Sequence, residues 1–408
     1  MNILIITPYF YPENFRINDL AIDFKNKKNH SLSVITPIPN YPEGKFYDGY
    51  GLFKRRKERW NGINIYRSIL IPRGTGSNIN LALSWISSIF GNLLLAINVL
   101  KSNYDLIFVF GPSPFTICLP AIFIKKIKNT PICFWVLDLW PESVSSAGKL
   151  KTSLIPQLLM PLVRFTYNNC DTILVSSPGF IESIKEKNIG IDNIKFFPQW
   201  AEPIFQKIKK QENSFLMVPK GSFIVMFAGN IGESQDFNSI LKAANQLKHN
   251  KRIHWVIIGS GRKEKWVKEK IFELGIKDVF HMIGRFPLEK MPGFYSQASA
   301  MLISLSKRHI FSLTIPAKLQ SYLACGKPVL AMIDGATAEL VRESKSGLVC
   351  NSENADQLAN NVLRMSEMTD YEIKRMGTNA HNLYMKKFNR DVLLNRLESI
   401  FFNLKNGL

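Results

Sequence analysis

The sequence has few cysteines and histidines, and neither type is spaced for metal binding. Its five cysteines are odd in number, far apart and set in apolar surroundings, without a Cys-x-x-Cys pair. This pattern predicts buried free thiols in a reducing compartment rather than a disulfide framework. The six histidines form no cluster with acidic residues at ligand spacing, and no Asp-x-Asp pair occurs. We therefore expect neither a metal ion nor a cofactor.

Acidic residues are scarce relative to basic ones. Lys and Arg total 52 against 32 Asp and Glu, which gives a net charge of +20 and predicts an anionic partner. The best candidate surface for nucleic acid is the run Lys-Arg-Arg-Lys-Glu-Arg-Trp at residues 54–60, but no nucleic-acid-binding module accompanies it. We interpret the run as a solvated face and expect no nucleic-acid partner. An anionic membrane surface is the stronger functional alternative.

The N-terminus lacks a basic segment, and its apolar run is too short for a signal peptide, so we expect a buried first strand and a cytoplasmic protein. Residues 74–100 lack any charged side chain and are long enough to cross a bilayer. Asn and Ser recur near helical spacing from Asn80 to Asn98, which argues against a spanning segment. Two interpretations remain open: a buried helix, or a helix in the membrane interface with Trp85 and Phe90 inserted.

Apolar strand-like runs alternate with helical segments along the chain, which predicts parallel sheets covered on both faces. In the first half we expect strands at residues 2–6, 32–36, 63–67, 105–110, 132–137 and 172–176. In the second half we expect strands at residues 223–228, 253–258, 279–283, 300–303, 328–332 and 348–350. The fold class is thus α/β with two doubly wound domains, whose loops at the carboxyl strand ends face a cleft.

The length and a composition shift predict the domain boundaries. The chain becomes polar and rich in lysine after residue 200. We expect an N-terminal domain at residues 1–200, a linker at 201–220, a second domain at 221–388, and a terminal helix at 389–408 that crosses back to the first.

Residues 310–333 form the most informative segment, because they read as a polar loop, a helix, a glycine stop and a buried strand. Pro316 suits the first helical turn and Gly326 suits the left-handed stop. The free N–H groups at the start of this helix, with Lys318 among them, suit an anion such as a diphosphate.

The stretch Pro-Ala-Lys-Leu-Gln-Ser-Tyr-Leu-Ala-Cys-Gly-Lys-Pro at residues 316–328 resembles the nucleotide-sugar signature of family 4 glycosyltransferases. Supporting segments are Tyr-Pro-Glu-Asn-Phe-Arg at 11–16, Pro-Asn-Tyr-Pro-Glu-Gly at 39–44, Asp-Leu-Trp-Pro-Glu-Ser at 138–143 and Phe-Ala-Gly-Asn-Ile-Gly at 227–232. Together they resemble the branch that builds bacterial O-antigen and capsule repeat units, including N-acetylfucosaminyltransferases. The resemblance implies the GT-B fold, with two Rossmann-like domains, and retention of anomeric configuration.

The resemblance also implies a donor site in the second domain. The family's Arg and Lys in the first loop of that domain correspond to neutral Asn230 and Gln235, so Lys318 would take over their charge. The family's pair of glutamates, one of which binds the ribose hydroxyls, is missing, and Ser321 stands at the second position. We therefore expect ribose recognition by Ser321, Gln320 or Glu339. The expected donor-binding residues are Gly229, Asn230, Gly232, Gln235, Gly259, Gly261, Arg285, Thr314, Lys318, Gln320, Ser321 and Glu339.

In the first domain, Asp138 and Glu142 follow a very apolar strand, and we expect them to share the cleft as catalytic carboxylates that orient or deprotonate the acceptor hydroxyl. The open alternative is that Asp138 caps a turn and Glu142 opens a helix. Arg16 is the third catalytic candidate, since a guanidinium grips diphosphate oxygens. The expected acceptor-binding residues are Asn14, Phe15 and Ser113.

Together with the charge and the apolar stretch, the resemblance implies a peripheral membrane glycosyltransferase on the inner face of the cell membrane. It would move a sugar, with N-acetyl-L-fucosamine from its UDP donor as the first hypothesis, to an undecaprenyl-diphosphate-linked saccharide in O-antigen, capsule or lipopolysaccharide assembly. The alternatives are a UDP-sugar epimerase on the same fold, or a non-catalytic protein that binds membranes or nucleic acid.

Overall fold

The computed structural model describes residues 1–143, 154–187, 189–190, 193–206, 216 and 218–407. They divide into two compact units. The first comprises Met1–Phe197 and Leu394–Leu408, and the second comprises Pro198–Leu393. The chain thus enters the second unit at Pro198, and its C-terminal end belongs to the first unit. Much of the expected linker at 201–220 lies outside the described residues.

The first unit is built on a mostly parallel sheet with the strand order β3-β4-β2-β1-β5-β6-β7-β8. Its strands are β1 Asn2–Ile6, β2 Ser31–Pro37, β3 Lys57–Trp60, β4 Ile63–Ser68, β5 Leu106–Gly111, β6 Ile132–Val136, β7 Thr172–Val175 and β8 Ile194–Phe196. Strands β5 and β6 are buried along their whole length, as expected for a parallel sheet covered on both faces. The strand order reverses between β1 and β5, so the loops after these two strands lie at a switch point where ligands bind in such folds.

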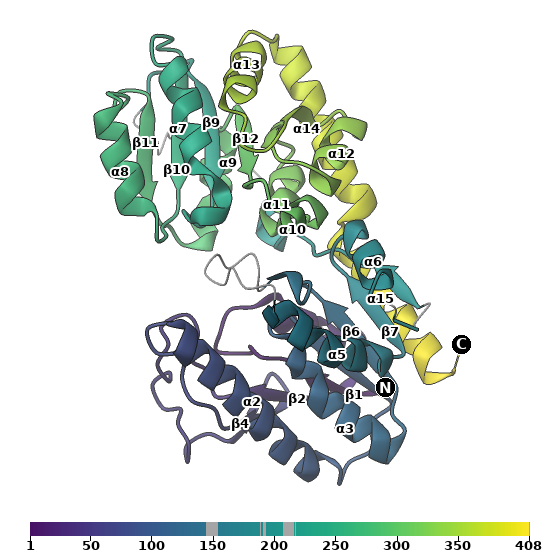
Figure 1. Cartoon of the computed structure of the whole chain (residues 1–408). Helices are drawn as coiled ribbons and strands as arrows, with labels where there is room; N and C mark the ends of the chain where they lie inside the picture. The colour runs from purple at the N-terminus through teal and green to yellow at the C-terminus, as the bar shows by residue number, and fades with distance from the viewer. Residues whose placement is uncertain (144–153, 188, 191–192, 207–215, 217, 408) are drawn as a thin grey trace. The chain divides into compact units, whose positions relative to one another are not determined.

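Helices flank this sheet (Figure 1). They are α1 Arg16–Asn26, α2 Asn78–Val99, α3 Leu119–Lys128, α5 Leu154–Asn168, α6 Pro178–Lys185 and most of α15, Arg390–Lys405. The C-terminal helix is held by Phe401, whose ring lies 5.5 Å from that of Phe24 and 5.1 Å from that of Phe108. Lys28 adds an ion pair with Glu398 at 2.7 Å.

The basic run at residues 54–60 ends in the edge strand β3, which pairs antiparallel with β4. Lys57 and Arg59 are exposed, while Glu58 is turned inward and forms an ion pair with the fully buried Arg67. Exposed positive charge on an edge strand prevents pairing with other chains. This arrangement agrees with the interpretation of the run as a solvated face.

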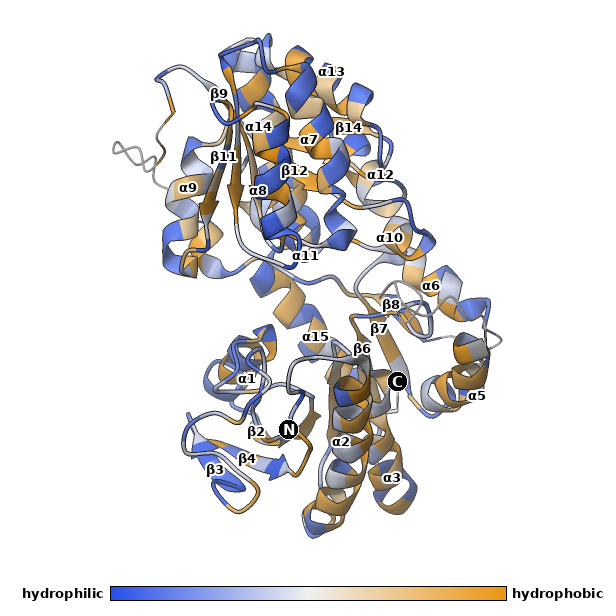
Figure 2. Cartoon of the chain, turned by 60° about the vertical axis from the view of Figure 1, so that its left-hand side comes forward, coloured by the Kyte–Doolittle hydropathy of each residue, from blue (hydrophilic) through white to orange (hydrophobic). Residues whose placement is uncertain are grey.

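Helix α2 has an inverted pattern of burial. Its polar residues Ser84 and Asn92 are buried, and a Cβ atom on Gly91 would lie 2.1 Å from the Ile69 carbonyl oxygen, so the helix approaches the unit through small and polar residues. Its large apolar residues form an exposed stripe of Ile79, Leu83, Ile86, Phe90, Leu94 and Ile97. The helix is largely orange in Figure 2. The interpretation as a buried core helix is therefore wrong for this stripe.

Trp85 is not part of the exposed stripe. Its ring lies 5.7 Å from the ring of Trp140 in an edge-on arrangement. The expectation that Trp85 inserts into a membrane is therefore corrected, because this side chain packs within the unit. Phe90, by contrast, is 64% exposed. Residues Ile79–Val99 are long and apolar enough to cross a membrane.

The second unit contains a parallel sheet with the order β11-β10-β9-β12-β13-β14. Its strands are β9 Phe223–Ala228, β10 Ile253–Ile258, β11 Phe280–Gly284, β12 Ala300–Ser304, β13 Val329–Met332 and β14 Gly347–Cys350. Its helices are α7 Phe237–Gln246, α8 Glu264–Glu273, α9 Met291–Gln297, α10 His309–Leu313, α11 Ala317–Ala324, α12 Ala336–Glu343, α13 Ala355–Ser366 and α14 Asp370–Lys387. The strand order reverses between β9 and β12, which places a second switch point at the loops after these strands.

Candidate functional site

The loop after β9 is packed tightly against the loop after β10. The Gly229 amide donates to the Ile258 carbonyl at 2.9 Å, and the Ile231 amide donates to the Ser260 carbonyl at 2.9 Å. A Cβ atom on Gly259 would lie 1.9 Å from the Gly229 carbonyl oxygen, and the φ of Gly259 is +140°. Only glycine allows this contact, so the two loops can pack directly against each other.

Lys318 is directed at this loop from the first turn of α11. Its ammonium lies 3.9 Å from the centre of the Phe227 ring and would be 3.1 Å from a Cβ atom on Gly229. The nitrogen is buried and has no hydrogen-bond acceptor among the described residues. Burial lowers the pKa of Lys318 to about 7. A buried, unpaired cation at a helix N-terminus is suited to an anionic group that enters from outside.

Tyr322 fixes the position of Lys318. Its hydroxyl accepts a hydrogen bond from the Ala228 amide and donates one to the Ala228 carbonyl, both at 3.0 Å. Because Lys318 precedes Tyr322 by four residues, the two side chains lie on the same face of α11. The end of β9 therefore holds α11 in a register that directs the lysine to Gly229. We did not predict this role for Tyr322.

The other predicted donor-binding residues differ in their exposure and in their hydrogen bonds. Asn230 is exposed, and its side chain lies beside Gly232 and Gly261. The side-chain oxygen of Gln235 accepts from the Gly232 amide at 3.1 Å and so closes the loop. Arg285 is exposed at the carboxyl end of β11.

Three predicted residues are turned into the protein. The Thr314 hydroxyl donates to the Ile310 carbonyl at 2.7 Å. The Ser321 hydroxyl, in a residue that is 6% exposed, donates to the Lys318 carbonyl at 2.9 Å. Gln320 is 1% exposed. With its side-chain amide in the orientation that gives both the oxygen and the nitrogen a hydrogen-bond partner, the nitrogen donates to the Pro316 and Ala317 carbonyls. We therefore correct the expectation that Gln320 and Ser321 recognise ribose. Glu339, in the first turn of α12, is the exposed member of that set.

In the first unit, Asp138 lies one strand away from the switch point and contacts the loop after β5 through Ser113. It follows β6, reaches solvent, and accepts a hydrogen bond from the Ser113 hydroxyl, which in turn accepts from the Trp140 indole nitrogen at 3.2 Å. Desolvation raises the pKa of Asp138 to about 6, although the Ser113 bond opposes this shift. A carboxylate held in place with such a pKa can accept a proton near neutral pH.

Glu142 does not share the surroundings of Asp138. Its carboxylate forms an ion pair with Lys187 at 2.6 Å and accepts from the Ser183 hydroxyl at 3.0 Å. Lys187 is 5% exposed, so removal of Glu142 would leave a buried charge unpaired. We therefore correct the assignment of Glu142 as a catalytic residue, because its carboxylate is committed to holding α6.

Glu13 was missing from the predicted site, although it lies between two of its loops. Its side chain is 1% exposed and accepts from the backbone amides of Asn40 at 2.9 Å and Tyr41 at 2.7 Å. Burial raises the pKa of Glu13 to about 7, against the effect of these amides. Glu13 thus joins the loop after β1 to the loop after β2. The segments 11–16 and 39–44 indicated these loops, but spacing alone did not show that they meet.

The three remaining predicted residues lie in the loop after β1 or at the start of α1. Asn14 is exposed, and the ring of Phe15 stacks on that of Tyr9 at 4.4 Å. Arg16 is the first residue of α1. The first unit thus brings Ser113, Glu13 and Phe15 to the loops of one switch point, and Ser113 joins Asp138 to them.

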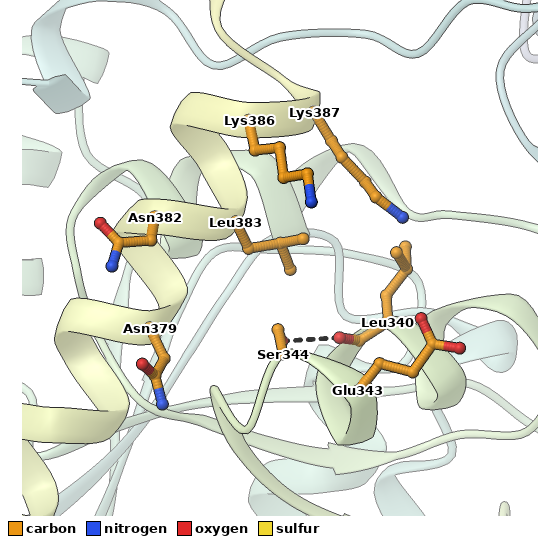
Figure 3. A pocket seen from close by; sticks show the side chains of 8 residues that line it. All are labelled: Leu340, Glu343, Ser344, Asn379, Asn382, Leu383, Lys386 and Lys387. Atoms are coloured by element: carbon orange, nitrogen blue, oxygen red, sulfur yellow. Dashed lines mark hydrogen bonds between the residues drawn. The ribbon is translucent and has the colours of Figure 1, made fainter.

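A cavity of about 290 Å³ lies elsewhere in the second unit (Figure 3). It is lined by Leu340, Glu343, Ser344, Asn379, Asn382, Leu383, Lys386 and Lys387 from the end of α12, the residue that follows it, and α14. None of the predicted site residues lines this cavity.

Comparison with known proteins finds a family model that is similar to much of the second unit. Residues 208–383 match the family model described as glycosyl transferases group 1. The chain is 24% identical over 345 residues to WcaI of Escherichia coli K12, which is named as a colanic acid biosynthesis glycosyl transferase. The aligned region covers 80% of this chain and 82% of that protein. The chain is 26% identical over 271 residues to WbjE of Pseudomonas aeruginosa, named as a glycosyltransferase, with 64% and 66% covered.

Solved structures show the same two-unit fold. HepE of Anabaena in complex with UDP superposes with a TM-score of 0.71 at 13% identity, over 99% of this chain and 100% of that one. Sucrose-phosphate synthase of Thermosynechococcus elongatus superposes with a TM-score of 0.77 at 14% identity, over the whole of both chains.

Proposed function

We propose, from the premise that this chain is a glycosyltransferase of the GT-B fold, that it transfers a sugar from a UDP donor to an undecaprenyl-diphosphate-linked saccharide in cell-surface polysaccharide assembly. The observation that carries the donor assignment is the unpaired ammonium of Lys318 over Gly229. The complexes of HepE with UDP and with UDP-glucose support a nucleotide-sugar donor. The names of both curated relatives favour a transferase over the epimerase and binding alternatives.

The chemistry assigned to the chain is stabilisation of a leaving diphosphate and orientation of an acceptor hydroxyl. Lys318 and the N-terminus of α11 would hold the negative charge of the departing UDP, with Arg16 as a further cation. Asp138 would orient the acceptor hydroxyl and accept its proton. We propose that these groups act without a metal ion and that the anomeric configuration is retained. Unchanged turnover in the presence of a chelator would support the metal-free part.

The first test is UDP release from a panel of UDP-sugars, with and without a lipid-diphosphate sugar acceptor. We expect acceptor-dependent release from one donor, with UDP-N-acetyl-L-fucosamine first in the panel. Lys318→Ala should abolish the release, while Lys242→Ala, which removes a lysine of α7 in the same unit, should leave it unchanged. The proposal would be refuted if the native protein released UDP from none of the UDP-sugars in the panel.

We also propose that the protein acts at the inner membrane surface through α2. Its exposed apolar stripe lies on a helix of 22 residues that has no charged side chain. Large apolar residues on the outer face and small residues on the inner face are typical of a helix that faces lipid. The chain's net charge of +20 suits an anionic surface. Flotation with anionic vesicles should capture the native protein and lose the Ile86→Ser/Phe90→Ser variant.

Phe272→Ser provides the matched control for this experiment. Phe272 is 70% exposed on α8 of the second unit, so the control makes the same chemical change outside the stripe. Equal capture of the stripe variant and the control would refute the role of α2.

A further inference from the structure

An arginine beside the first-unit site is held by aromatic rings rather than by acids. The Arg73 guanidinium lies 6.0 Å from the centre of the Tyr9 ring and 5.3 Å from that of Tyr41, and it donates to the Tyr9 hydroxyl at 3.1 Å. Among the described residues, Arg73 forms no ion pair. The N–H donors of a guanidinium have a fixed planar geometry. Because those of Arg73 have no carboxylate partner, they are suited to bind an oxyanion.

The rings around Arg73 form a rigid cluster. Tyr9 stacks on Phe15 at 4.4 Å with an interplanar angle of 8°, and Tyr41 packs against both at 5.2 and 5.5 Å. Asn40 accepts from the Arg73 amide at 3.3 Å, and its own amide donates to Glu13 at 2.9 Å. Tyr41 is 39% exposed, so the cluster presents one aromatic ring to solvent. Such a ring beside a cation can stack on a sugar that carries phosphate.

The surface next to this cluster is apolar. Ile71, two residues before Arg73, is 49% exposed, and its amide donates to the Ser87 hydroxyl of α2 at 2.8 Å. Ile71 therefore connects the segment of Arg73 to α2, the helix that carries the outer stripe, within one unit. A ligand that fits all three features has a sugar, an oxyanion and a hydrocarbon chain in that order.

We infer that Arg73, with Tyr9 and Tyr41, binds the diphosphate of the lipid-linked acceptor and that its chain leaves along Ile71 and α2. This inference rests on the proposed transfer to a lipid-linked sugar. In this proposal the acceptor sugar extends from the diphosphate toward the Asp138 carboxylate. The Tyr9 hydroxyl stays protonated, because burial raises its pKa to about 12.

The test measures binding of three probes to the full chain: farnesyl diphosphate, farnesol and inorganic diphosphate. Native protein should bind farnesyl diphosphate at least about tenfold more tightly than either of the other two. Arg73→Gln should weaken farnesyl diphosphate binding by about 10- to 100-fold and leave farnesol binding unchanged. Arg73→Lys should fall between, because it keeps the charge and loses the fork. Arg59→Gln, at an exposed arginine of β3, should bind all three as the native chain does.

UDP binding, measured in parallel, separates this inference from the proposed function. Native affinity for UDP that is kept in Arg73→Gln places Arg73 with the acceptor; a parallel loss would assign it to the donor and overturn the inference. Equal binding of farnesyl diphosphate by the native chain and both Arg73 variants would overturn it too. A native chain that binds no UDP and turns over no UDP-sugar defeats the proposed function, while the three probes still report on Arg73.

Discussion

The Lys318 ammonium lies 3.9 Å from the centre of the Phe227 ring, and this ring is its nearest compensation for the loss of water. A cation over an aromatic face gains about 1–2 kcal/mol, which is less than the cost of burying an ammonium without hydrogen bonds. The second unit therefore keeps a charge that destabilises it until a ligand arrives. A stored cost of this kind is typical of a binding site.

Replacing Lys318 with Met should therefore stabilise the folded protein and weaken its binding of UDP. We expect the second unit of Lys318→Met to unfold at a temperature a few degrees higher than native, in line with about 1–3 kcal/mol. The gain should be full at pH 6 and shrink as the pH rises above 7, because the folded-state pKa of about 7 lies below the usual 10.5. Calorimetry at both pH values, with UDP titrations, checks this. A lower unfolding temperature at pH 6 would contradict it.

The pKa of Lys318 also predicts how UDP affinity depends on pH. Below pH 7 the lysine of the free protein is charged, so its titration should leave the affinity unchanged. Above pH 7 a proton must be taken up on binding, and the dissociation constant should rise by up to about tenfold per pH unit. Lys318→Arg should lack this rise, because arginine stays charged. The ratio of native to variant dissociation constants removes the titration of UDP itself, and a flat ratio from pH 6 to 9 would exclude the effect.

Asp138→Asn should lower the turnover number by about 10²- to 10⁴-fold and leave UDP binding intact. In the native protein, activity should fall as the pH drops below about 6, because protonation removes the carboxylate. The pH profile of kcat in both proteins measures this. An acid limb that persists in Asp138→Asn would assign the titration to another group.

In contrast to Asp138→Asn, Glu142→Gln should lower the stability of the protein and leave its activity little changed. Loss of the carboxylate leaves Lys187 buried and unpaired, so unfolding should require about 2–4 kcal/mol less free energy. Turnover per folded molecule should be little changed. Urea unfolding together with active-site titration distinguishes the outcomes, and a stable but inactive Glu142→Gln would restore Glu142 to the catalytic set.

Tyr322→Phe tests whether the position of α11 matters for Lys318. The change removes both hydrogen bonds to Ala228 and leaves a buried backbone amide without its partner. We expect about 1–2 kcal/mol of lost stability and a several-fold weaker binding of UDP. Tyr384→Phe is the matched control on α14, since its hydroxyl accepts from Gln206. If Tyr322→Phe and Tyr384→Phe weaken UDP binding equally, the hydrogen bonds of Tyr322 have no specific role in positioning Lys318.

The central strands could be predicted because burial on both faces leaves a continuous apolar run. The expected strands 2–6, 223–228 and 253–258 coincide with β1, β9 and β10. Strands β3 and β8 were missed because they are short edge strands of four and three residues, each with a lysine, and lack a continuous apolar run. Their pairing partners, rather than their own composition, make them strands.

The site was only partly predictable for a related reason. Lys318 and Asp138 follow local signals, namely a helix start and the end of a buried strand. The contacts of Glu13 with Asn40 and of Arg73 with Tyr9 join residues far apart in the chain, and no local pattern records them. For α2, periodicity showed two faces but not which one is buried, because that depends on what lies outside the helix.

The exposed stripe of α2 also has a consequence for the protein in dilute solution without lipid. Copies of the chain can associate through this stripe, and the net charge of +20 keeps them apart. Added salt shortens the reach of that repulsion to about 10 Å at 0.1 M and does not weaken apolar contact. Light scattering should therefore show growing particles as the ionic strength rises, because the colloidal stability of the protein in such solutions depends on its charge.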